Sequence, residues 1–100
     1  MIPSHKIAES FSALSHASRV DILLALMPHA TNGLTAGEVA ERTKIPPSTL
    51  AHHLREMEMG HVIQRIAEGR KTIIKPDLTS LSQIAGLISE LCCCAEDETQ

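Results

Sequence analysis

Apolar residues recur along most of this chain at the three-to-four-residue spacing of amphipathic helices, with one interruption. Between residues 60 and 76, apolar and polar residues alternate instead, which is typical of half-buried strands. The pattern therefore predicts a mainly α-helical domain with one β-hairpin. The predicted helices cover residues 3–14, 18–27, 35–43 and 47–59 and a stretch from 77 or 78 to 91, and the predicted strands cover residues 62–66 and 71–75.

Residues with strong local preferences mark the ends of several predicted elements. Ser18 and Thr35 each stand three residues before an acidic residue, which is the spacing of a capping box at the start of a helix. Pro47 suits a first helical turn, because its missing N–H would have no partner there. Gly60 ends the same helix as a C-terminal glycine does. Residues 67–70, with a glycine near the tip, connect the two strands as a four-residue hairpin loop.

The helix of residues 47–59 divides into an apolar and a polar face. At about 100° per residue, one face carries Leu50, His53, Leu54 and Met57, and the opposite face carries Ser48, His52, Arg55 and Met59. A helix in the DNA major groove needs short donors near its start and a cation further along. We expect His53 to be a partly buried imidazole and His52 to face DNA. A surface helix with ordinary polar residues is the alternative, and on this helix alone it carries more weight.

The neighbours of this helix favour DNA binding. The preceding helix reaches it across the tight connection Lys44-Ile45-Pro46, and two short helices joined in this way form a helix-turn-helix. The β-hairpin that follows is a wing, whose tip can reach backbone phosphate or the minor groove. The predicted DNA-binding residues are Ser48, Thr49, His52 and Arg55 on the helix and Arg70 and Lys71 on the wing.

Charge is segregated along the chain. The net charge is −3, but residues 42–75 carry seven basic and three acidic side chains, so this segment has +4 and the rest has −7. A local concentration of basic residues is a better guide to nucleic-acid binding than the charge of the whole chain. A solvated charged face is the alternative interpretation.

Size and composition limit the core. One hundred residues make a single domain, 1–100, and with one Phe and no Trp or Tyr the core must be built from aliphatic side chains. A small aliphatic chain of this kind often gains further buried area by dimerising. The longest strictly apolar run, residues 22–27, is too short to span a bilayer, and no leader is apparent, so we expect a cytoplasmic protein.

The order of these elements resembles the arsenic-repressor (ArsR/SmtB) family of winged helix-turn-helix regulators. The resemblance covers roughly residues 7–91. It implies a homodimer that pairs through its first and last helices and leaves operator DNA when an effector binds. The matching motifs are Leu-Ser-His-Ala-Ser-Arg-Val-Asp-Ile-Leu at residues 14–23, Ser-Thr-Leu-Ala-His-His-Leu at residues 48–54, and Gly60-His-Val-Ile leading into Glu68-Gly-Arg.

The cysteine-rich C-terminal segment, residues 91–100, is the expected effector segment. Glu90-Leu-Cys-Cys93 is similar to an element in an arsenic-responsive branch of the family, although that branch commonly places its third cysteine further downstream than Cys94. Other relatives carry a cysteine pair before the turn or zinc-binding histidines on the last helix. Here residues 34–41 hold no cysteine, and no histidine follows His61.

The chemistry of Cys92, Cys93 and Cys94 favours a thiophilic effector. Adjacent cysteines do not readily form a regular disulfide, and soft thiolates suit trivalent arsenic or antimony bound by three sulfurs. Consecutive helical side chains point about 100° apart, so the sulfurs converge if the helix unwinds at Cys92, which a frayed acidic tail would permit. A divalent soft metal and thiol oxidation or persulfidation remain alternatives, as does a DNA-binding or adaptor protein with no small effector.

No combination of residues predicts catalysis. The sequence shows no Ser/His/Asp set, no Gly-rich phosphate loop and no paired carboxylates. A catalytic cysteine would need one activated thiolate beside a base in a cleft, rather than three at a chain end. We therefore expect no enzyme and no required cofactor. The expected partners are double-stranded operator DNA and a second copy of the chain, with no membrane.

Overall fold

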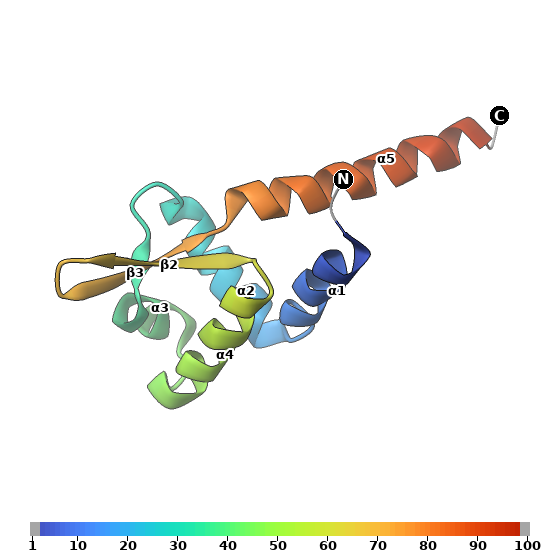
Figure 1. The fold of residues 1–100 in the computed structure, drawn as a ribbon. Helices are drawn as coiled ribbons and strands as arrows, with labels where there is room; N and C mark the ends of the chain where they lie inside the picture. The colour runs from blue at the N-terminus through green and yellow to red at the C-terminus, as the bar shows by residue number, and fades with distance from the viewer. Residues whose placement is uncertain (1–2, 99–100) are drawn as a thin grey trace.

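The fold is mainly helical, with a small sheet at one side of the helices (Figure 1). The computed structural model describes the backbone of residues 3–98 and the side chains of residues 3–93. Along the chain it contains α1 (Ser4–Ala13), α2 (Ala17–Leu26), a 3-10 turn (Met27–His29), β1 (Leu34–Thr35), α3 (Ala36–Thr43), α4 (Pro47–Met59), β2 (Ile63–Glu68), β3 (Lys71–Pro76) and α5 (Leu78–Glu98).

The sheet has three antiparallel strands in the order β1-β3-β2, where two strands were predicted. The additional strand, β1, pairs Leu34 with Ile74 and Thr35 with Ile73. Two residues are too few to show an alternating pattern, so the sequence gives no sign of this strand. The wing turn also differs from the prediction. Strand β2 continues to Glu68, which leaves a two-residue turn in which Gly69 has a φ of +63°.

The core is aliphatic, as the composition requires. It lies between α2, α3, α4 and the sheet, and partly buried residues such as Leu23, Ile45 and Leu81 pack against it. Burying such side chains is the main stabilising contribution to a domain of this size. The largest fully buried side chains are Ile22, Leu26, Leu50, Met57, Ile63, Ile74, Val39 and Val62.

The two predicted capping boxes have different outcomes. Thr35 accepts a hydrogen bond from the Glu38 N–H, and the Glu38 carboxylate accepts one from the Thr35 N–H, so this box is confirmed. The Ser18 box is wrong, because α2 begins at Ala17 and Ser18 already lies inside its first turn. The capping position belongs to His16, whose extended backbone precedes the helix and whose side chain makes no capping hydrogen bond.

The end of α4 also differs from the prediction. A C-terminal glycine commonly adopts a left-handed backbone, but Gly60 has a φ of −84°. The left-handed residue is the next one, His61, with a φ of 63°. The position requires glycine for a different reason, which is its close contact with α1.

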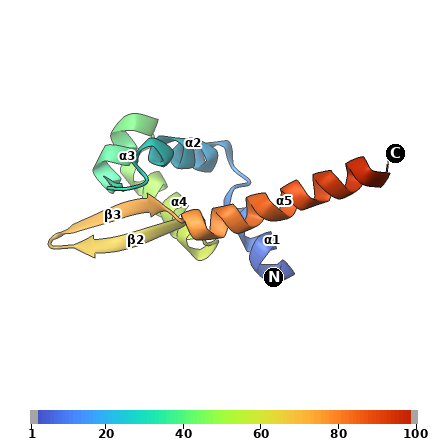
Figure 2. The ribbon, with the colours of Figure 1, turned by 90° about the horizontal axis from the view of Figure 1, so that it is seen from above.

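Helix α5 begins at Leu78 and projects away from the rest of the molecule (Figures 1 and 2). It packs on the body near its start, through Leu81 and Ile84. The backbone is helical through the three cysteines to Glu98, where a frayed acidic tail was expected, and residues 99 and 100 of that tail lie outside the described residues. No helix in the described part of the chain is long and apolar enough to cross a membrane.

Candidate nucleic-acid interface

Helix α4 presents one face to the core and the other to solvent. Leu50, Leu54 and Met57 are buried, which fixes the rotation of the helix about its axis. The start of α4 is formed as predicted, with Pro47 in the first helical turn. Because the opposite face stays free, the predicted helix residues Ser48, Thr49, His52 and Arg55 are all exposed.

The wing carries the two remaining predicted DNA contacts. Arg70 lies in the turn and Lys71 opens β3, and both side chains are exposed. Arg65, on β2, is held by an ion pair with Glu58 at the end of α4, with Arg65 Nε 3.5 Å from Glu58 Oε1. In Figure 1 the wing and the start of α4 both lie on the opposite side of the body from the free end of α5. The arrangement can place hydroxyl, imidazole and guanidinium groups against a duplex from two elements.

A partly buried hydrogen bond joins α4 to α2. Arg19 Nε donates to His53 Nδ1 over 3.0 Å, and the Arg19 side chain is almost fully buried, with 7% of the residue exposed. Because Nδ1 accepts, the neutral His53 ring carries its proton on Nε2. Burial and the neighbouring Arg19 cation lower the pKa of His53, and His52 and His16 add smaller effects in the same direction. His53 is thus the partly buried, satisfied imidazole that its helical position predicted.

Arg19 is a site residue that the sequence analysis did not select. A signal for it exists, because Arg19 shares helical spacing with Ile22 and Leu26 and therefore falls on the buried face of α2. Arginine is rarely buried unless its charge has a partner. The position alone therefore predicts a partner, although it does not identify His53, which is 34 residues away in the chain.

The C-terminal cysteines are on α5. Cys92 and Cys93 are free and exposed, and the side chain of Cys94 lies outside the described residues. Among the side chains that are described, no group of three or more His, Cys, Asp or Glu is placed to hold a metal ion. The predicted three-sulfur site therefore stays a prediction.

Comparisons with known proteins match part of the sequence and nearly all of the fold. Residues 14–61 match a helix-turn-helix domain family. A search of curated protein sequences finds no match. Among solved structures, an ArsR-like transcriptional regulator from Rhodococcus sp. RHA1 is 20% identical and covers 95% of this chain and 87% of its own, with a TM-score of 0.80.

Two further solved structures share the fold, one a homodimer and the other bound to an oligodeoxyribonucleotide. The homodimeric winged helix-turn-helix DNA-binding domain of Mb0332 from Mycobacterium bovis, a possible ArsR-family regulator, is 19% identical, with a TM-score of 0.67 and coverage of 93% of this chain and 81% of its own. A mutant of MepR from S. aureus bound to an oligodeoxyribonucleotide is 17% identical, with a TM-score of 0.63 and coverage of 94% and 73%. These structures confirm the predicted winged helix-turn-helix fold, and the match over residues 14–61 falls within it.

Proposed function

We propose that this chain is an ArsR-family transcriptional repressor that binds operator DNA with α4 and the wing. The observation that carries this proposal is the exposed polar face of α4, held outward by three buried apolar residues on its other side. The basic wing tip supplies phosphate contacts beside it. The fold is shared with an ArsR-like regulator and with a MepR mutant bound to an oligodeoxyribonucleotide, which supports the same use of the surface here.

The repressor acts as a homodimer through α1 and α5. Phe11 on α1 and Ile88 and Leu91 on α5 are 49%, 45% and 61% exposed, so both helices present large apolar side chains to solvent. An open groove of about 800 Å³ runs between the two helices. A second copy would cover these apolar residues, and the homodimeric Mb0332 domain supports this arrangement.

Trivalent arsenic or antimony is the proposed effector, bound by Cys92, Cys93 and Cys94. The donors suit the ligand, because thiolates are soft and each As–S bond forms as a thiol gives up its proton and arsenite loses a hydroxyl as water. The helical arrangement does not suit it, because consecutive side chains diverge by about 100°. Binding therefore requires the end of α5 to open. An effector that favours this opened state lowers DNA affinity if the opened state binds DNA less well.

The experiment follows DNA release by the reduced protein. DNA selected by the wild type from a random library is bound, and arsenite, cadmium or zinc is then added. We expect arsenite to release the wild type from DNA. The Cys92→Ser and Cys93→Ser variants should need at least roughly tenfold more arsenite for the same release, since a switch of occupancy requires a large difference in effector affinity between the two states. Cys94→Ser should have the smallest effect, and the triple Cys→Ser variant serves as the insensitive control.

The outcomes separate the alternatives. If Cys92→Ser and Cys93→Ser both release DNA as readily as the wild type, the cysteines are not the sensor. Release by cadmium or zinc but not by arsenite indicates a divalent metal. Release by a mild oxidant, reversed by a reductant, indicates thiol oxidation. DNA binding that no addition changes indicates a regulator without a small effector at this segment.

A further inference from the structure

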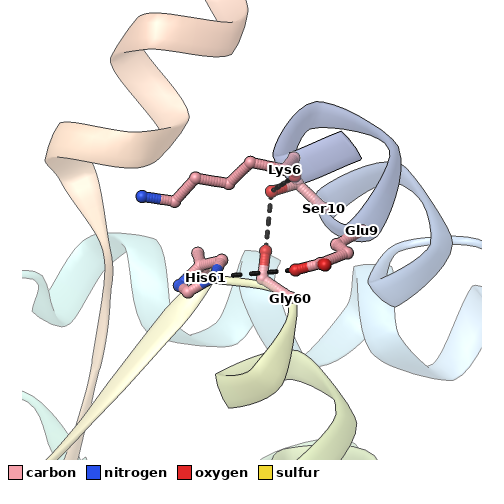
Figure 3. A network of polar contacts seen from close by, with 5 residues as sticks. All are labelled: Lys6, Glu9, Ser10, Gly60 and His61. Atoms are coloured by element: carbon pink, nitrogen blue, oxygen red, sulfur yellow. Dashed lines mark hydrogen bonds and ion pairs between the residues drawn. The ribbon is translucent and has the colours of Figure 1, made fainter. Parts of the chain in front are cut away.

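Helix α1 crosses the C-terminal end of α4 and is hydrogen bonded to it there (Figure 3). Ser10 Oγ, on α1, donates to the Gly60 carbonyl oxygen over 2.6 Å, and Ser10 is 2% exposed. The same hydroxyl lies 3.2 Å from the Lys6 carbonyl in its own helix, which is the longer of the two contacts. A buried serine on an amphipathic helix needs such an acceptor, because an unpaired buried hydroxyl is costly.

Gly60 is needed here because of space rather than backbone conformation. A Cβ at this position would lie 2.4 Å from the Ala13 Cβ and 2.8 Å from the Glu9 carbonyl oxygen. Both distances are shorter than real Cβ atoms tolerate, and one of the atoms is in the backbone of α1. Any side chain at residue 60 would therefore push α1 away from α4.

The next residue holds the chain in an unfavourable conformation at the same place. His61 has a φ of 63°, a left-handed conformation that is uncommon for residues other than glycine. Its ring Nε2 lies 3.7 Å from Glu9 Oε2 on α1 (Figure 3). Both side chains are substantially exposed, so this ion pair is a weak addition to the buried contacts. Helix α1 is thus joined to the corner between α4 and β2 by the Ser10–Gly60 hydrogen bond, by the close packing at Gly60 and by the contact between Glu9 and His61.

We propose that Ser10 and Gly60 are positioning residues that set the orientation of α4 relative to α1, and so the separation of the two α4 helices in the dimer. This inference rests on the proposed function. Helix α1 packs chiefly on α4, while α1 and α5 carry the exposed apolar residues of the proposed dimer interface. The junction of α1 and α4 therefore lies between the surface that pairs the protomers and the surface that binds DNA.

The test compares DNA with one half-site and DNA with two half-sites at varied spacing. Dimeric regulators of this kind engage half-sites about one helical turn apart, so an altered separation of the α4 helices changes the preferred spacing. In Gly60→Ala, we expect a changed preferred spacing and a loss of roughly tenfold, or about 1.4 kcal/mol, on the wild-type two-site DNA. Affinity for a single half-site should stay within about twofold. Gly37→Ala on α3 is the matched control, because a Cβ there would meet only Thr35 Oγ1, at an ordinary contact distance of 3.9 Å, and the residue lies outside the proposed dimer interface.

A second variant removes the hydrogen bond without adding volume. Ser10→Ala should lower affinity for the two-site DNA by up to roughly fivefold, the equilibrium factor that one hydrogen bond can contribute to holding α1 and α4 in their relative orientation, with little change on a single half-site. Ser12→Ala, at an exposed position on the same helix, is its control. If circular dichroism shows that Gly60→Ala is unfolded, the Ser10→Ala measurements alone test the positioning role.

The outcomes distinguish the two proposals. A wild type that selects no DNA overturns the proposed function, and the positioning role with it. A wild type that selects DNA, while both variants keep its spacing preference and its ratio of two-site to one-site affinity, overturns the positioning role alone. Equal losses on one-site and two-site DNA also overturn it, since they indicate a general structural defect.

Discussion

The hydrogen bond between Arg19 and His53 joins two helices through side chains that would both be cationic at low pH. Arg19 Nε donates to His53 Nδ1, so a proton on Nδ1 would place two donors against each other. Burial of the ring, together with the neighbouring Arg19 cation, keeps the pKa of His53 below its ordinary value of 6.5. The charged groups around the ring, Arg19 and the neighbouring His16 and His52, all act in the same direction.

The first prediction concerns pH and stability. The unfolded chain takes up a proton at His53 near its ordinary pKa, whereas the folded chain resists protonation, so folding is stabilised above pH 6.5. That contribution is lost as the pH falls from 6.5 towards the lower pKa of the folded state. Urea denaturation at about pH 7.5 and about pH 5 should show a smaller loss of unfolding free energy in His53→Gln than in the wild type. His5→Gln, at an exposed position, should lose as much unfolding free energy between the two pH values as the wild type. An equally large loss in His53→Gln would contradict the prediction.

The exposed cations of the candidate interface are expected to affect DNA affinity and its dependence on salt. Arg55 on α4 and Arg70 at the wing tip are free to approach phosphates. Replacing either by Ala should weaken DNA binding and reduce the slope of log affinity against log salt by roughly one unit per lost phosphate contact. Fluorescence anisotropy at several salt concentrations measures both quantities. Lys6→Ala, on α1 and outside the basic segment, should leave the slope unchanged; an unchanged affinity and slope in Arg55→Ala or Arg70→Ala would remove that residue from the interface.

At the scale of elements, local sequence predicts most helices because their signals lie within a few residues. The Thr35 box, the start of α4 at Pro47 and the buried face of α4 all depend on spacing along one helix. Strand β1 and the role of Gly60 depend on contacts between distant segments, with β3 and with α1 respectively. The six predicted DNA contacts are exposed as spacing requires, but the Arg19–His53 bond behind them needed the tertiary structure.

The two capping candidates give a paired prediction. Thr35→Ala removes a formed capping box at the start of α3 and should lower the free energy of unfolding by about 1 kcal/mol. Ser18→Ala should change it by less than about 0.5 kcal/mol, because Ser18 makes no capping hydrogen bond at the start of α2. Chemical denaturation of both variants measures the difference. Equal losses would mean that Ser18 caps α2 in solution.

The shape of the whole molecule leaves α5 without full packing. The chain measures 54 × 25 × 25 Å, and the long dimension follows from α5 extending beyond the body (Figure 2). Helices in proteins gain most of their stability from tertiary packing of an apolar face. In the second half of α5 that face carries Ile88 and Leu91, both exposed in the single chain. A second copy of the chain is the simplest proposed source of the missing contacts. The apolar stripe in the sequence led to the same prediction.

The last prediction tests this partner directly. In Ile88→Glu, a carboxylate without a counter-ion would be buried in the proposed dimer interface, at a cost of several kcal/mol. Because Ile88 is 45% exposed in the single chain, the substitution removes little of the protomer's own core. We therefore expect analytical ultracentrifugation to show monomers. These monomers will be unfolded if the protomer needs its partner chain in order to fold. Thr79→Glu is the control, since this exposed residue lies nine positions earlier and so nearly opposite Ile88 on α5. A folded, dimeric Ile88→Glu variant would show that the second half of α5 does not pair the protomers.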